Sequence, residues 1–115
     1  MFERRRLRKH GTHGQATVRD AQQHPKTATN DWRKYDFVVD VHPAAGGAPF
    51  RAELQETFVI GGLMPRAGDV VGVIYDAPSR RVMFDLAGDT RYDLDAQKAE
   101  QRSAREQLLR EPPLP

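Results

Sequence analysis

Four histidines are the side chains of this chain best suited to hold a metal ion: His10, His13, His24 and His42. Three neutral imidazoles can complete a zinc site, and His10 and His13 have the spacing H-x-x-H. That pair falls in the glycine-rich stretch "HGTHG" rather than on a helix that would fix both rings. An H-E-x-x-H motif is missing, and the chain has no cysteine. We therefore predict that the histidines are surface residues and that no metal or cofactor is bound.

Carboxylates are numerous toward the end of the chain, where an acid–base enzyme would need two of them in one cleft. They stand at predicted turns and at a helix start, where Asp is favoured for local hydrogen bonding. The two serines lie in no nucleophile motif, and phosphate-binding glycine loops are absent. We therefore predict no catalytic residue and a protein that is not an enzyme. The carboxylates concerned are Asp76, Asp85, Asp89, Asp93 and Asp95.

Glu56 is the one charge on the apolar side of a predicted strand, in line with Leu54 and Phe58. A buried carboxylate needs a partner. A β-bulge or an edge position would instead turn Glu56 to solvent, which agrees with how rarely Glu is fully buried. We expect the solvent-facing arrangement; the partners that the sequence offers for a buried one are Arg51, Arg80 and Arg81.

Positive charge is concentrated at the start of the chain. Residues 1–34 hold nine Lys and Arg against three Asp and Glu, although the net charge of the whole chain is +2. Terminal charge runs are usually solvated, but such a segment can also neutralise phosphates. Small barrels stack bases on strand aromatics, so a nucleic-acid surface would use Arg4, Arg5, Arg6, Arg8, Lys9, Trp32, Arg33 and Lys34.

Two features of the strand that carries Trp32 weigh against nucleic acid. Tyr35 and Phe37 alternate in phase with Val39, on the predicted core face, so Trp32 is the one aromatic there that is free to stack. The opposite face of the same strand carries Asp36 and Asp40, and carboxylates repel phosphate.

Period-two alternation of apolar residues predicts five strands. The first begins after Gly14, and the clearest covers residues 32–43. Residues 49–60 pair with that strand across a turn at 44–48. Two shorter runs, at 70–75 and 82–86, form a second hairpin about the polar breaker 76–81. Polar and breaker-rich connections are predicted at 24–31 and 61–69.

Residues 93–111 predict a helix, because they contain no Gly, Pro, Val or Ile and are dominated by strong helix formers. Asp93 or Asp95 can cap its start, and "PPLP" ends it. Its large apolar residues are few, so the helix is loosely docked, frayed or free for a partner. In a partner's groove, the helix anchors would be Leu94, Leu108 and Leu109.

Five short strands and a terminal helix predict a mainly β fold, a small antiparallel five-stranded barrel of the OB or SH3-like kind. An open sheet would leave both edges exposed. The predicted organisation is a basic arm at 1–10, the barrel domain at 11–91, and a helix with a Pro-rich tail at 92–115. No apolar run approaches the roughly 20 residues that cross a bilayer. With no cysteine present, we expect a cytoplasmic protein.

Four stretches carry a resemblance: "HGTHGQATV", "YDFVVDVHP", "APFRAELQETF" and "PRAGDVVGVIYDAPSRRVMFDL". Over about residues 11–86 the chain resembles small β-barrel domains of unknown function that are common in actinobacterial genomes. The last stretch is similar to the ending those domains share, a Gly-x-x-Val strand, a Tyr-Asp-x-Pro turn and a short apolar strand. The resemblance implies the fold and an actinobacterial type of protein, and it implies no activity. Relatives often carry membrane spans beside this domain, which this chain lacks.

These observations predict a non-enzymatic module that binds another macromolecule. A protein partner, bound through the basic arm or the C-terminal helix, is the first hypothesis, and nucleic acid is the alternative. Edge pairing between two barrels would give a homodimer, and the sequence leaves that question open.

Overall fold

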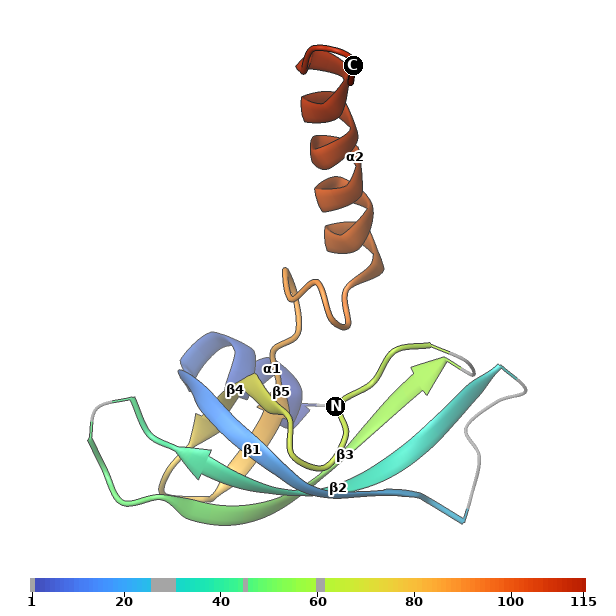
Figure 1. Cartoon of the computed structure of the whole chain (residues 1–115). Helices are drawn as coiled ribbons and strands as arrows, with labels where there is room; N and C mark the ends of the chain where they lie inside the picture. Colours follow the sequence, from blue (N-terminus) through green and yellow to red (C-terminus); the bar gives the residue numbers. More distant parts are fainter. Residues whose placement is uncertain (1, 26–30, 45, 60–61) are drawn as a thin grey trace.

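The computed structural model describes the backbone of residues 2–25, 31–44, 46–59 and 62–115, and side chains in these ranges from residue 4 onward. The predicted connection at 24–31 lies largely outside these ranges, as do Ala45, Ile60 and Gly61. Along the chain the elements are α1 (Phe2–His10), β1 (Thr12–Gln23), β2 (Trp32–His42), β3 (Phe50–Val59), β4 (Val70–Asp76), β5 (Arg81–Phe84) and α2 (Leu94–Arg110) (Figure 1).

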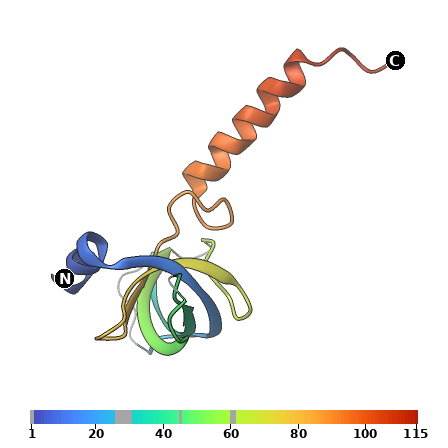
Figure 2. The same cartoon turned by 90° about the vertical axis from the view of Figure 1, so that its left-hand side faces the viewer.

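The five strands form one antiparallel sheet in the order β3-β2-β1-β4-β5. β1 is its centre, because it pairs with β2 along one side and with β4 along the other. The pairing of β1 with β2 shifts register between Val18 and Asp20, and such a bulge bends a strand and increases its twist. Viewed from the side in Figure 2, the sheet curls into a nearly closed barrel. The predicted fold class is confirmed.

The barrel has one seam, between β3 and β5. Every neighbouring pair of strands is antiparallel, so in an order of five the two outermost strands run parallel. Within the described residues, no backbone ladder joins them. Aromatic packing bridges the gap instead: the Phe84 ring of β5 lies 4.8 Å from Phe37 and 6.5 Å from Phe58, between ring centroids.

The barrel interior is filled by the alternate residues that the strand patterns predict. Phe37, Val39 and Val41 of β2 are buried, while Asp36 and Asp40 stay on the wetter outer face. The core side chains are Ala16, Val18, Phe37, Val39, Val41, Ala52, Leu54, Val71, Val73, Tyr75, Val82 and Phe84.

Residues 2–10 form a docked helix, whereas the sequence predicts a solvated arm. Leu7 of α1 is buried against Ile74 of β4 and Met83 of β5, in a second small cluster outside the barrel. Ile74 and Met83 lie on the outer face of their strands, so these apolar side chains need a cover that shields them from water. Gly11 allows the close turn into β1, because a Cβ there would lie 2.5 Å from Ile74 Cγ2 and from the Leu7 carbonyl oxygen. The cover explains why α1 forms, since a helix this short is marginal on its own.

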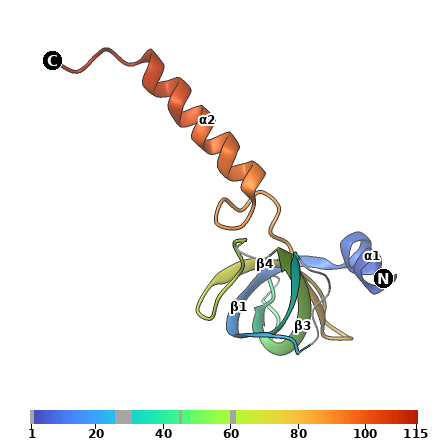
Figure 3. The same ribbon diagram turned by 90° about the vertical axis from the view of Figure 1, so that its right-hand side faces the viewer.

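α2 projects away from the barrel, as Figures 1 and 3 show from two directions. None of its residues is buried. The molecule is accordingly elongated, 60 × 40 × 26 Å with a radius of gyration of 17.3 Å, where a compact domain of this length has about 13 Å. Of the arrangements expected from the sequence, docking of this helix on its own barrel is not observed.

Candidate interaction surfaces

The segment that leads into α2 is bound to the start of β4. The Arg91 guanidinium donates a hydrogen bond to the Val70 carbonyl oxygen at 2.7 Å, and to the Asp89 carboxylate at 2.9 Å. Beside it, the Tyr92 hydroxyl donates to Asp69 Oδ2 at 2.6 Å. The Tyr92 ring packs against the barrel core. These contacts fix the last residues before the helix on the rigid sheet.

Asp93 then starts α2 and links it to the same segment. Its side chain accepts hydrogen bonds from the backbone N–H of Asp95 at 3.0 Å and of Ala96 at 3.2 Å. Its other oxygen accepts from the Gly88 N–H at 2.8 Å. The Gly88 and Ala96 amides hold the pKa of Asp93 below its usual range. Of the two caps that the sequence offered, Asp93 fills the position, and the direction of α2 is set at its base.

The contact between Tyr92 and Asp69 changes the pKa of both side chains. Burial, and then the hydrogen bond to Asp69, raise the pKa of Tyr92 to about 12. The Tyr92 hydroxyl and the Arg66 backbone N–H lower the pKa of Asp69. A raised tyrosine pKa stabilises the fold below the unfolded-state pKa of about 10, and this stabilisation is lost as the pH rises toward the folded-state value.

We therefore expect Tyr92→Phe to lower the free energy of unfolding at neutral pH by about 1.5–3 kcal/mol, the usual range for a hydrogen bond to a charged group. Between pH 10 and about 12 the folded protein keeps the Tyr92 proton that the unfolded chain releases, so stability should fall with rising pH. Urea unfolding across this range measures both effects. Tyr35→Phe is the control, since it removes a hydroxyl without touching Asp69; equal slopes in the two variants would contradict the assignment.

Three exposed leucines lie along one side of α2. Leu94, Leu108 and Leu109 are 56%, 67% and 78% exposed. Fourteen or fifteen residues make about four helical turns, so Leu94 shares a side of the helix with the other two, about 21 Å away along the axis. Lys98 and Arg105 lie between them. The candidate surface therefore has an apolar contact at each end and a basic, polar middle.

Four cations of α1 point into solvent, while the fifth is used by the fold. Arg5, Arg6, Arg8 and Lys9 are exposed. Arg4 Nη2 lies 2.7 Å from Glu56 Oε1 and donates to the Gln55 carbonyl oxygen at 3.3 Å. Arg4 thereby connects α1 to β3 across the seam: its side chain is 52% exposed, but its charge is paired with Glu56.

Glu56 lies on the edge strand β3 and is only partly turned to solvent. Its side chain is 18% exposed, and β3 pairs with β2 without a register shift, so no bulge reverses its direction. Its partner is Arg4 and none of the three arginines named from the sequence. Of those, Arg51 is engaged on the outer face, where it donates to both oxygens of Asp40 at 2.7 and 3.1 Å.

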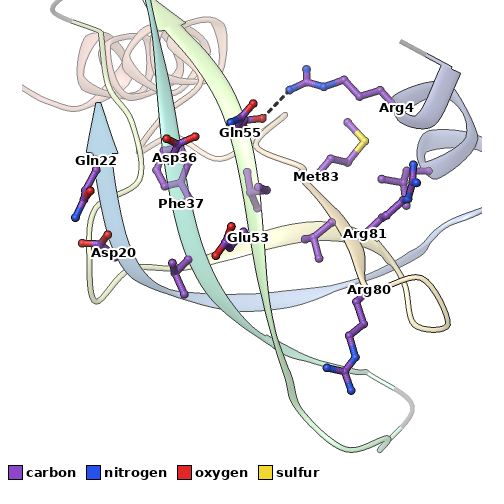
Figure 4. Close-up of a pocket in the computed structure, with 14 residues that line it drawn as sticks. Arg4, Asp20, Gln22, Asp36, Phe37, Glu53, Gln55, Arg80, Arg81 and Met83 are labelled. Atoms are coloured by element: carbon purple, nitrogen blue, oxygen red, sulfur yellow. Dashed lines mark hydrogen bonds between the residues drawn. The ribbon is translucent and has the colours of Figure 1, made fainter. Parts of the chain in front are cut away.

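A groove of about 650 Å³ runs beside the seam and carries opposite charges on its two sides. Figure 4 shows Asp20, Asp36 and Glu53 on the outer face of β1, β2 and β3, with Arg4 and Arg80 across from them. The carboxylates on the acidic side repel phosphate, so that side of the groove is disfavoured as a phosphate surface.

The remaining predicted nucleic-acid residues are at the start of β2. Trp32 is 46% exposed, as expected for an aromatic residue outside the core, and the Arg33 guanidinium donates to the Trp32 carbonyl oxygen at 3.1 Å. Trp32 and Lys34 pair with Val59 and Thr57 of β3, whereas α1 approaches β3 from the seam. The eight predicted residues therefore lie in two groups, on either side of β3.

The histidines are distributed over separate contacts. His13 Nδ1 lies 3.2 Å from Asp85 Oδ2, and His42 Nε2 lies 3.0 Å from the Thr17 hydroxyl. Among the side chains that the structure describes, no three His, Cys, Asp or Glu residues are grouped to hold a metal ion. Within the same part of the chain, no helix has both the length and the apolar character that crossing a bilayer requires.

No protein-family model matches this chain, and no curated protein or solved structure matches it either. The resemblance to actinobacterial small β-domains stays a prediction.

The sequence alone did not indicate the contacts that orient α2. The sequence pattern places Asp69 in a connection and Arg91 at the end of the barrel domain, and 23 positions separate Asp69 from Tyr92. The available signal was Tyr92 itself, an aromatic residue in the otherwise polar stretch "GDTRYD". An aromatic residue directly before a helix cap has a large surface to bury, and it marks a docking point.

Proposed function

We propose that this protein is a non-enzymatic β-barrel module that binds another protein through α2. The observation that carries the proposal is the contrast between the base of α2, which is fixed on the barrel, and the rest of the helix, which is uncovered. Tyr92 and Arg91 hold its base on the barrel, yet no residue along α2 is buried. We place this activity in the cytoplasm of an actinobacterial-type cell, as the absence of cysteine and the sequence resemblance suggest.

The physical argument concerns preorganisation. Most helices in proteins are stabilised by packing of an apolar face, which α2 does not have on its own barrel. A partner groove that covered Leu94, Leu108 and Leu109 would remove the apolar surface now in water, at about 1.5–3 kcal/mol for each fully buried side chain. Because the base of α2 is already fixed, little rotational freedom of the helix is lost on binding. A partner with acidic groups between two apolar pockets would match Lys98 and Arg105.

The test is affinity capture from a lysate of the source organism, with bound proteins quantified by mass spectrometry. We expect Leu108→Glu combined with Leu109→Glu to reduce recovery of a specific partner at least tenfold. Ser103→Glu, on the far side of the helix, is the matched control and should leave recovery unchanged. Equal recovery with all three proteins would show that α2 does not make the contact.

A second candidate is nucleic-acid binding by the exposed side of α1. Four neighbouring cations, Arg5, Arg6, Arg8 and Lys9, could neutralise phosphates. In fluorescence anisotropy with labelled single- and double-stranded oligonucleotides, we expect this candidate to show affinity that falls steeply with salt. Replacing the four cations by Gln while keeping Arg4 should abolish binding of both oligonucleotides. If bases stack on Trp32, Trp32→Ala should weaken binding of the single strand alone. Absence of binding at low salt would remove this candidate.

A further inference from the structure

The residues after α2 have a backbone conformation that their own sequence imposes. Glu111 has φ −75° and ψ 150°, the values of a polyproline II helix. Proline fixes φ near −65°, and a residue that precedes proline is driven to extended or polyproline II geometry. In "EPPLP", Glu111, Pro112 and Leu114 each precede a proline, and Pro113 is one. Glu111, Pro112 and Leu114 are thus driven to extended or polyproline II geometry, and the φ of Pro113 is fixed at a value that this helix uses.

This conformation gives the segment a regular surface. A polyproline II helix has three residues per turn and a rise of about 3.1 Å per residue. Pro112 and Pro115 therefore lie on one edge, about 9 Å apart, in the spacing P-x-x-P. Leu114 occupies a different edge. The backbone makes no internal hydrogen bonds in this geometry, so its carbonyl groups are available to a donor on a partner.

The segment is also fully accessible. All of 111–115 is exposed, and Leu114 is 94% exposed. α2 has seventeen residues, so it carries the segment about 25 Å beyond the base of the helix, away from the barrel (Figure 2).

We propose that residues 111–115 are a recognition segment for a protein groove lined by stacked aromatic side chains, of the kind that binds P-x-x-P ligands. Such grooves insert the proline edge between aromatic rings and donate a hydrogen bond to the peptide carbonyl. A preformed segment loses little conformational entropy on binding. The proposal shares with the proposed function only the premise that the partner is a protein, and it uses different residues.

The test applies the full chain to an array of purified SH3, WW and EVH1 domains, with affinities measured by fluorescence anisotropy or surface plasmon resonance. We expect at least one domain to bind saturably, and Pro112→Ala combined with Pro115→Ala to weaken that binding at least tenfold. These substitutions follow the end of α2, so the fold is unaffected. Leu108→Ala combined with Leu109→Ala should change the affinity by less than twofold, which separates this segment from the leucine side of α2.

Two results would overturn the proposal. One is that no domain on the array binds up to millimolar concentration. The other is that the double alanine variant binds as tightly as the original chain. Either could occur while lysate capture through Leu108 and Leu109 succeeds, so the two proposals fail independently.

Discussion

Phe37→Ala is expected to lower the free energy of unfolding by about 3–5 kcal/mol, the range for truncating a buried aromatic residue. The Phe37 ring is almost wholly buried, and its centroid lies within 6.5 Å of three other rings, those of Phe84, Phe58 and Tyr35. The ring contacts Phe58 of β3 and Phe84 of β5, the two strands of the seam, where backbone pairing is missing. The loss therefore removes packing at the place where the barrel depends on side chains alone.

Urea unfolding monitored by circular dichroism measures this effect. Small domains are stable by only about 5–15 kcal/mol, so the variant should unfold at a much lower urea concentration. Trp32→Ala is the matched control, because it truncates an exposed aromatic residue on the same strand, and it should change stability by about 1 kcal/mol or less. If Phe37→Ala also lowers the free energy of unfolding by less than about 1 kcal/mol, β2 does not present this ring to the core.

Leu7→Ala is expected to lower the free energy of unfolding by about 2–3 kcal/mol and to release α1 from the barrel. Leu7 is the buried side chain of α1, packed on Ile74 and Met83. Without it, a nine-residue helix has too few internal hydrogen bonds to persist. Arg4 would then lose the position from which it meets Glu56 across the seam.

Limited trypsin digestion separates a docked helix from a solvated arm. In the original chain, docking should protect the bonds after Arg4, Arg5 and Arg6, and in Leu7→Ala cleavage there should be at least fivefold faster, since proteolysis follows local opening. Arg8→Ala is the control: it truncates the next, exposed residue and should change stability by less than about 0.5 kcal/mol. Equal digestion of the Leu7→Ala variant and the original chain would show that the segment is not held on the barrel.

The strands and the helix were predictable because their signals are local. Alternation in "YDFVVDV" sets which side chains of β2 enter the core, and the absence of Gly, Pro, Val and Ile over 93–111 indicates a helix whatever it contacts. A curled sheet then follows from the need to bury one face and protect edges. The fold class can therefore be predicted from short-range sequence patterns.

The docking of α1 was not predictable in the same way. Its charge pattern resembles a solvated segment, and the one contact with Glu56 joins residues 52 positions apart. A weaker signal existed on the barrel surface that α1 covers. Ile74 and Met83 there are apolar residues in phase with the outer face of their strands. Outward apolar residues on two neighbouring strands require a cover, although the sequence does not say which segment supplies it.

Hydrogen exchange of the α2 amides in the isolated protein tests the central claim most directly. A helix that packs on nothing opens locally at little cost, whereas central strands exchange only through global unfolding. We predict that amides over 95–110 exchange within about a hundredfold of the unstructured rate, and that those of β1 and β2 are slower by several further orders of magnitude. Protection of α2 equal to that of the central strands would contradict the account, because the helix would then already be covered.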